Sequence, residues 1–272
     1  MVNQLHNYGK KKKYMTKVIV IADVHDAPAI PKDRMKWIGK HIDKQDPDHV
    51  VQIGDFATFD SLCWHIGNET MSGRNKGTFN EDIESFKKCL SVLDNSMKKY
   101  KGSKHVTYGN HEHRLYKWEQ QNPEIYSMMQ KQLSDTLTSF GWNHTIYGMF
   151  HMIDGVGFTH IPFNIMGKEF GGVSVERNIG QHSLFDVVFG HSHKYNDIRC
   201  PKIGDSNYVR VLNVGCSLPY GHVENYCKVC TTGWAWGITE INIFDNHIQD
   251  VNFISMKTLE GMYDTRRNHR RS

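Results

Sequence analysis

The stretch TKVIVIADVHD, which runs from Thr16 to Asp26, decides the expected fold. Its apolar part, Lys17–Ala22, has the length and composition of a buried β-strand and runs directly into a polar loop. Beyond that loop, Asp33–Asp43 carries apolar residues on one helical face, and a second apolar strand, His49–Ile53, follows Pro47. Strand, helix and strand in this order predict a β-α-β unit of an α/β protein.

The rest of the chain continues this alternation and then becomes rich in strands. The clearest helix places apolar residues at spacings of three and four, namely Ile83, Phe86, Leu90, Leu93 and Met97. A helical stretch with Pro123 in its middle extends to about Ser139. Another helix is expected near Ser174–Ser183. Further strands are expected at His105–Tyr108, around a hairpin at Asp154-Gly155, and at Phe185–Phe189, Val209–Val214, Ala235–Phe244 and His247–Ile254.

These elements predict one α/β domain with two sheets and helices outside them. We expect residues 1–15 to be a polar N-terminal extension, residues 16–258 to form the domain, and residues 259–272 to be a basic C-terminal tail. Positive charge gathers in both end segments, at Lys10–Lys13 and at Arg266, Arg267, Arg270 and Arg271. Such short charged ends are typically solvated.

Composition narrows the class of protein. The chain has 272 residues, 39% of them hydrophobic, and a formal net charge of +4, which excludes wholesale disorder. No apolar run approaches the roughly 18–20 residues of a membrane helix, and no apolar segment follows the Lys run as in a secretory signal. Six cysteines without a regular framework, Cys227 and Cys230 included, favour a reducing compartment. We therefore expect a cytoplasmic protein with no membrane partner. The 17 histidines are the outlier, because His is the commonest metal ligand.

Polar residues gather where the apolar strands end. The segments are Asp23-Val24-His25, Gly54-Asp55, Gly109-Asn110-His111-Glu112, Thr159-His160 and Gly190-His191-Ser192-His193. Ligands of open α/β sheets collect at the carboxyl ends of the strands, and a glycine lets the backbone turn sharply there. Asp, Asn and His together supply oxygen and nitrogen ligands, which suit first-row transition metals, whereas Ca²⁺ and Mg²⁺ prefer oxygen. Taken singly, Asp23 or Asp55 would be read as a turn or capping residue.

In this order, DVH, GD, GNHE, a single His and GHSH resemble the motifs of the calcineurin-like metallophosphoesterases. The resemblance runs from about Lys17 to His193, and LNVGCS at Leu212–Ser217 is similar to a later turn of the family. GDF, FDSL and GNHEHR also resemble small stand-alone phosphoesterases of bacteriophages and bacteria, which implies the host cytoplasm for a phage-encoded protein. The resemblance implies a four-layer α/β/β/α sandwich with a di-metal site at the C-terminal ends of the strands.

The same resemblance implies a ligand set and a reaction. The implied ligands are Asp23, His25 and His193 for the first ion, Asn110, His160 and His191 for the second, and Asp55 between the two. The cofactors would be two divalent transition-metal ions (Mn, Fe, Zn or Ni), with Mn favoured. A metal-bridging hydroxide would attack the phosphorus of a phosphodiester, and His111 would assist the leaving group.

Three positions leave alternatives open. His113, His144, His151 and His182 compete with His160 for the single-His position, and His160 is preferred because it directly ends an apolar strand. Arg114 is expected either to bind the substrate phosphate or to be an exposed helix charge. Thr58 stands where the family usually has an acidic residue or Asn, so the support that this position gives to the site is in question.

The substrate is left open by the motifs, because specificity lies in the loops between them. The favoured substrate is a phosphodiester, with DNA or RNA as its polymeric form. One alternative is a phosphomonoesterase that acts on proteins or small molecules through the same site, and another is a metal-stabilised binding protein without turnover. The sequence does not indicate an oligomeric state.

Overall fold

The computed structural model describes residues 15–63, 69–204, 207–224 and 233–264. The N-terminal extension up to residue 14, the arginine cluster near the C-terminus, and both Cys227 and Cys230 lie outside the described residues. Within the described residues, no helix is long and apolar enough to cross a membrane.

The first sheet is built around the β-α-β unit that opens the domain. In order along the sheet, its described strands are β11 (His247–Ser255), β10 (Gly237–Phe244), β1 (Thr16–Ile21), β2 (His49–Gln52), β3 (Ser103–Thr107) and β4 (Asn143–Thr145). Strands β1 to β4 pair in parallel, whereas β10 and β11 are antiparallel additions on the other side of β1. The carboxyl ends of β1, β2 and β3 therefore meet at one edge.

The second sheet also has a parallel centre. Its described strands, in order, are β5 (His151–Ile153), β6 (Val156–Phe158), β7 (Val187–Phe189), β9 (Tyr208–Val214) and β8 (Tyr195–Pro201). Strand β7 pairs in parallel with both β6 and β9, and β5 and β8 are antiparallel edge strands. The hairpin expected at Asp154-Gly155 joins β5 to β6.

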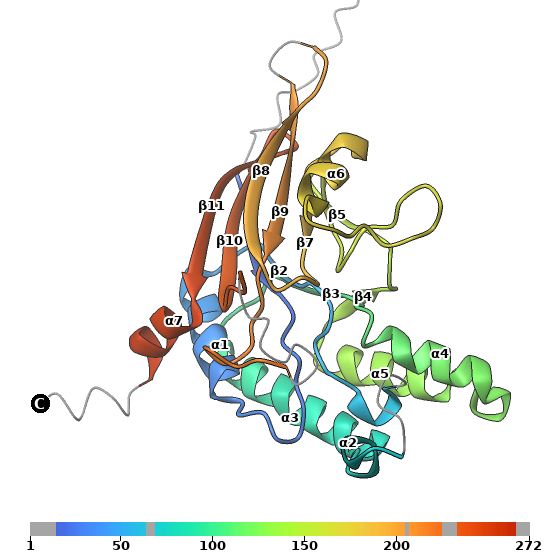
Figure 1. The fold of residues 1–272 in the computed structure, drawn as a ribbon. Helices are drawn as coiled ribbons and strands as arrows, with labels where there is room; N and C mark the ends of the chain where they lie inside the picture. Colours follow the sequence, from blue (N-terminus) through green and yellow to red (C-terminus); the bar gives the residue numbers. More distant parts are fainter. Residues whose placement is uncertain (1–14, 64–68, 205–206, 225–232, 265–272) are drawn as a thin grey trace, which may run out of the picture.

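The helices lie outside both sheets (Figure 1). The α-helices are α1 (Asp33–Gln45), α2 (Met71–Arg74), α3 (Phe79–Ser96), α4 (His113–Gln121), α5 (Met128–Ser139), α6 (Val175–His182) and α7 (Met256–Tyr263). Two 3₁₀ turns, η1 (Asp60–Leu62) and η2 (Pro123–Ile125), complete the described helical segments. The helical stretch expected around Pro123 is therefore divided into α4, η2 and α5, because proline disrupts a helix interior.

Three hydrophobic clusters correspond to the three interfaces of a four-layer sandwich. One cluster packs α1, α3 and α7 against the first sheet, through side chains such as Ile19 and Ile21 of β1. Val18 and Val20 point to the opposite face and belong to the cluster between the two sheets. A third cluster packs α6 against the outer face of the second sheet. The α/β fold with two sheets and outer helices is confirmed.

Several elements differ from the expectations. Strand β8 and helix α7 were not predicted. The boundary expected between residues 258 and 259 falls inside α7, where the side chain of Leu259 is fully buried. Residues 259–264 are therefore not part of a solvated tail, because α7 packs its apolar face onto the core shared with α1.

Candidate metal centre

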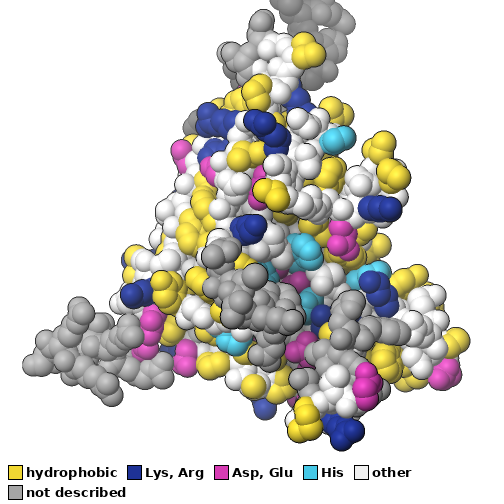
Figure 2. All heavy atoms as spheres, viewed as in Figure 1, with side chains coloured by type: hydrophobic (Ala, Val, Ile, Leu, Met, Phe, Trp, Pro, Cys, Tyr) yellow, Lys and Arg dark blue, Asp and Glu magenta, His cyan; other side chains and the backbone are white. Residues whose placement is uncertain are grey.

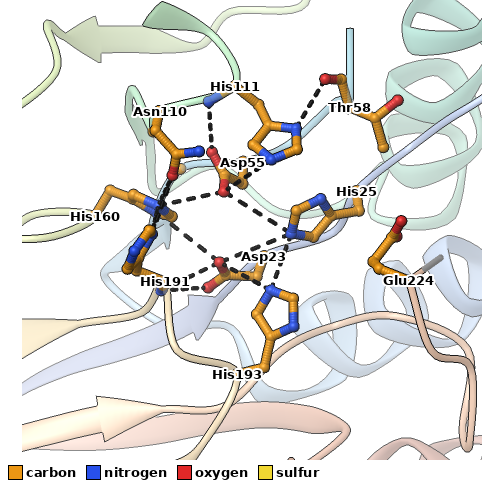
Figure 3. Close-up of polar contacts among 12 residues, drawn as sticks. Asp23, His25, Asp55, Thr58, Asn110, His111, His160, His191, His193 and Glu224 are labelled. Carbon is orange, nitrogen blue, oxygen red and sulfur yellow. Dashed lines mark hydrogen bonds and ion pairs between the residues drawn. The ribbon is translucent and has the colours of Figure 1, made fainter. Parts of the chain in front are cut away.

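The strand-end segments of both sheets meet in one place, and their backbones share an unusual conformation. Five of the residues expected to bind metal have left-handed φ angles: 41° at Asp23, 46° at His25, 47° at Asp55, 69° at His191 and 59° at His193. Such angles are uncommon outside glycine and cost free energy, and they concentrate at functional sites. Here they turn side chains at the ends of β1, β2 and β7 toward one shared space (Figure 3).

The first group consists of Asp23, His25 and His193, all of them buried. The Nε2 atoms of His25 and His193 lie 3.0 Å apart, and Oδ1 of Asp23 lies 3.5 Å from Nε2 of His193. Two nitrogens that are each about 2.1 Å from one ion, at a right angle, are separated by about 3.0 Å. The donor atoms of this group therefore fit a single transition-metal ion.

The second group consists of Asn110, His160 and His191, with Asp55 beside it. Nε2 of His160 lies 3.0 Å from Oδ1 of Asn110, 3.1 Å from Nδ1 of His191 and 3.3 Å from Oδ2 of Asp55. The same Oδ2 atom is 3.8 Å from Nε2 of His25 in the first group. Asp55 thus lies between the two groups, where a bridging carboxylate would be needed.

The histidines that competed with His160 lie elsewhere. His144 stacks on Tyr108, His151 stacks on His105, and His113 stacks on Tyr116. His182 is on α6, where its ring contacts a backbone carbonyl of its own helix. Of these candidates, the structure brings only His160 to the shared space.

Charges within the centre are strongly coupled. Burial alone would lower the pKa of His160, but Asp55 and Asp23 raise it to about 10. Burial would raise the pKa of Asp55, but His111 and His160 hold it well below its ordinary value. Burial, together with His111 and His193, lowers the pKa of His25 well below the usual range. The two carboxylates therefore attract positive charge into a buried space, which is the electrostatic condition for binding divalent cations.

His111 is held by the backbone of the loop after β2. Its Nδ1 donates to the carbonyl oxygen of Thr58 at 2.8 Å, and its backbone N–H donates to Oδ1 of Asp55 at 2.9 Å. Since Nδ1 carries the proton, Nε2 is the unprotonated nitrogen, and it lies 3.8 Å from Oδ2 of Asp55. The residue at position 58 therefore contacts His111 through its backbone carbonyl group.

A family model described as calcineurin-like phosphoesterase matches residues 16–195. The chain belongs to this family. The protein is therefore a metal-dependent phosphoester hydrolase, and the family uses divalent metal ions. Its resemblance to the family in fold and motif order, expected from the sequence, is confirmed.

Solved structures show more distant similarity. Purple acid phosphatase PPD1 from yellow lupin (Lupinus luteus) seeds is 14% identical over 90% of this chain and 54% of its own, with a TM-score of 0.41. Protein TT1561 of Thermus thermophilus is 9% identical over 75% of this chain and 90% of its own, with a TM-score of 0.37. No curated protein sequence matches this phosphoesterase.

Glu112 is a residue of the phosphoesterase centre to which the motif analysis assigned no role. Its buried carboxylate accepts hydrogen bonds from the backbone N–H groups of Asp55 (2.9 Å), Phe56 (2.8 Å) and Gly109 (2.7 Å). It therefore ties the loop that carries Asp55 to the loop that carries His111. A Cβ atom on Gly109 would lie 2.1 Å from Oδ1 of Asp55, so only glycine permits this approach. The sequence offered one indication of this role, because Glu112 is the fourth residue of the GNHE motif.

Charged groups of both signs border the phosphoesterase centre. Arg114 donates to the carbonyl of Thr58 at 2.6 Å and to Asp60 at 3.2 Å, and its Nη2 lies 3.2 Å from Nε2 of His111. Glu224 lies beyond His25 in Figure 3. Burial, with a smaller contribution from Asp60, raises the pKa of Glu224 to about 7. Arg114 was expected from the sequence, whereas Glu224 was not, because no motif includes it.

Proposed function

We propose that this phosphoesterase hydrolyses phosphodiesters, nucleic acid included, at a centre that holds two divalent ions, with Mn²⁺ as the favoured ion. Asp23, His25 and His193 would hold one ion, Asn110, His160 and His191 the other, and Asp55 would contact both. The observation that carries the proposal is the position of Asp55 Oδ2, which is 3.8 Å from Nε2 of His25 in one group and 3.3 Å from Nε2 of His160 in the other.

Bound divalent ions would polarise the phosphoryl oxygens and make hydroxide available from water near neutral pH. The chain's own residues would supply orientation and proton transfer. The Thr58 carbonyl fixes the Nδ1–H tautomer of His111, so Nε2 is the atom that would hold or deliver a proton at the leaving oxygen. Arg114, beside that Nε2 atom, would place a positive charge on the same side of the phosphate.

The charge pattern favours diesters over monoesters. A phosphomonoester carries up to two negative charges at neutral pH, because its second pKa is about 6, whereas a diester carries one. Asp60 and Glu224 lie near Arg114, and their negative charge would oppose a dianion more strongly than a monoanion. The segment between Leu115 and Asn143, which forms α4, η2 and α5, offers an extended surface for the substituents that a diester has and a monoester lacks.

The test is a comparison of bis-p-nitrophenyl phosphate, p-nitrophenyl phosphate and single-stranded DNA, each with Mn²⁺-loaded protein across a salt series. We expect faster turnover of the diester, and DNA cleavage that declines steeply with salt. Metal-depleted protein is the control. Faster turnover of the monoester, with no DNA cleavage at low salt, would overturn the proposal in favour of a phosphomonoesterase.

A further inference from the structure

A cavity of about 480 Å³ opens at Trp118, one helical turn along α4 from Arg114. It lies between η1, the start of α3, and the α4–η2–α5 segment. Among the described residues its walls include Phe79, Trp118, Ile125, Met128, Met129 and Gln132. The volume falls within the range typical of small-molecule sites. We call it the α4–α5 pocket.

Two structural connections join the α4–α5 pocket to the metal centre. Arg114 and Trp118 are four residues apart on α4, so they share one face of the helix, and Nη2 of Arg114 lies 3.2 Å from Nε2 of His111. On the opposite wall, Asp60 pairs with Arg114, and the adjacent Ser61 lines the pocket. Arg114 and its partner Asp60 therefore lie between His111 and the residues that line the pocket.

The lining defines the chemistry of the group that would bind. The described lining residues are aromatic, aliphatic, thioether or uncharged polar, and none of them carries a charge. Phe79 and Trp118 supply aromatic surface, and the amide of Gln132 supplies both a donor and an acceptor. One wall is fixed in place, because the Ser61 hydroxyl donates to Asp82 at 2.6 Å. Such a lining suits a flat, uncharged aromatic group with polar edges.

From this arrangement we infer that the α4–α5 pocket binds the nucleobase of the leaving nucleoside. The inference rests on the proposed function, since it requires a diester whose leaving group carries a base. His111 would face the leaving oxygen, Arg114 the phosphate, and the pocket the base. Bases that stack on aromatic side chains gain affinity with little dependence on sequence, so base identity should matter less than base presence.

The kinetic test compares two dinucleoside phosphates, one with an intact leaving nucleoside and one whose leaving sugar lacks its base. The intact substrate should have a kcat/KM about tenfold higher in the wild type. Gln132→Trp, which places an indole in the pocket, should remove this advantage. Gln121→Trp is the matched control at an exposed position of α4 outside the pocket lining, and it should keep the advantage. An equal kcat/KM for both substrates in the wild type would overturn the inference.

A binding test separates this inference from the proposed function. Metal-depleted wild-type protein is titrated with adenosine and, as a control, with ribose, and saturation-transfer NMR reports binding. Adenosine should bind wild type and Gln121→Trp but not Gln132→Trp, and ribose should bind none of them. If this pattern is observed while no diester is hydrolysed, the diesterase proposal is wrong and the assignment of the pocket to a nucleobase is supported. If adenosine binds all three proteins alike, or none, the pocket assignment is wrong whatever the activity.

Discussion

Two groups of histidines in this phosphoesterase differ in their place on the strands and in the residues that surround them. The first group, which we call the metal-centre group, lies on the loops after the strands, beside Asp23 and Asp55. It consists of His25, His111, His160, His191 and His193. The second group, which we call the strand histidines, lies on β2, β3, β4 and β5 and consists of His49, His105, His144 and His151. Its polar partners among the described residues are hydroxyls, as at His105 Nε2, which lies 2.7 Å from Oγ1 of Thr145. The rings of His105 and His151 are nearly parallel and stack with their centroids 3.5 Å apart.

The contrast is clearest in the direction of two pKa shifts. Burial lowers the pKa of His105 to about 4, with His151 and His144 adding to the effect. Burial acts in the same direction on His160, but Asp55 and Asp23 reverse it and raise the pKa to about 10. Neighbouring carboxylates therefore favour a positive charge at the ring, whereas the same ring on an extended strand without a carboxylate packs as a neutral aromatic.

The largest expected difference between the groups is in activity. His191→Ala removes a proposed ligand, so activity should fall by at least about 10³-fold, because charge neutralisation and hydroxide supply are lost together. His151→Ala is the matched substitution in the strand histidines, and it should leave both metal content and kcat within about threefold of wild type. Elemental analysis and steady-state kinetics make the measurement. Full activity in His191→Ala, or activity that survives chelation, would contradict the ligand assignment.

A second prediction distinguishes His111 from the proposed metal ligands. The distances would also allow His111 to join a metal cluster with His25 and Asp55. We expect His111→Asn to retain both ions and to lose about 10²–10⁴ in rate, as for a positioned acid–base group. Substrates with good leaving groups should lose less, because they need little protonation. Loss of metal in this variant would instead make His111 a ligand.

Most of the fold was predictable because the strands that position the centre are buried. Val18–Ile21 and Val50–Val51 are apolar on both faces, since they lie between a helix layer and a second sheet, and they read as unbroken runs. Strand β8 escaped prediction because it is an edge strand with mostly exposed or half-buried side chains, so it lacks an apolar pattern. Helix α7 has only Met256 and Leu259 fully buried, too few to establish a helical period.

The candidate site, too, could be predicted from the sequence only in part. The proposed ligands could be selected from the sequence, because side-chain type and strand-end position carry the signal. The hydrogen bond that holds His111 could not be predicted, because its acceptor, the Thr58 carbonyl, is a backbone group that every residue type has. Glu224 was missed because it belongs to none of the motifs, the last of which ends at Ser217. The α4–α5 pocket depends on how α4, η1 and α3 pack, which no local pattern encodes.

A third prediction concerns the stability of the centre's loops. In Glu112→Gln, the amide can offer one acceptor oxygen but places an NH₂ group against a backbone N–H, so a buried donor loses its partner. The free energy of unfolding should fall by about 1–3 kcal/mol, measured by urea denaturation of metal-depleted protein. The comparison is Ser103→Ala, which removes the partner of His49 at a more exposed site and should cost less than about 1 kcal/mol. An equal loss in both variants would show that Glu112 has no special role.

The smallest predicted effect is the pH dependence that the strand histidines give to folding. The pKa of His105 is about 4 in the folded protein and about 6.5 when exposed, so between these values the unfolded chain binds a proton that the folded chain does not. Protonation then favours unfolding, and the free energy of unfolding should decrease as pH falls from about 6.5 toward 4.

We expect His105 to contribute roughly 1–2 kcal/mol of this decrease. This is less than the free energy that the whole pKa shift would give, because solvent at the exposed His144 screens the charge. His105→Gln keeps a hydrogen-bonding side chain near Thr145 but cannot titrate. Urea denaturation of both metal-depleted proteins at pH 7 and pH 5 should therefore show a smaller decrease in the variant, and the protonation of the metal-centre histidines cancels in the difference. If the two proteins lose stability equally between these pH values, His105 is not held neutral by its surroundings, and the electrostatic contrast between the two histidine groups is smaller than the structure indicates.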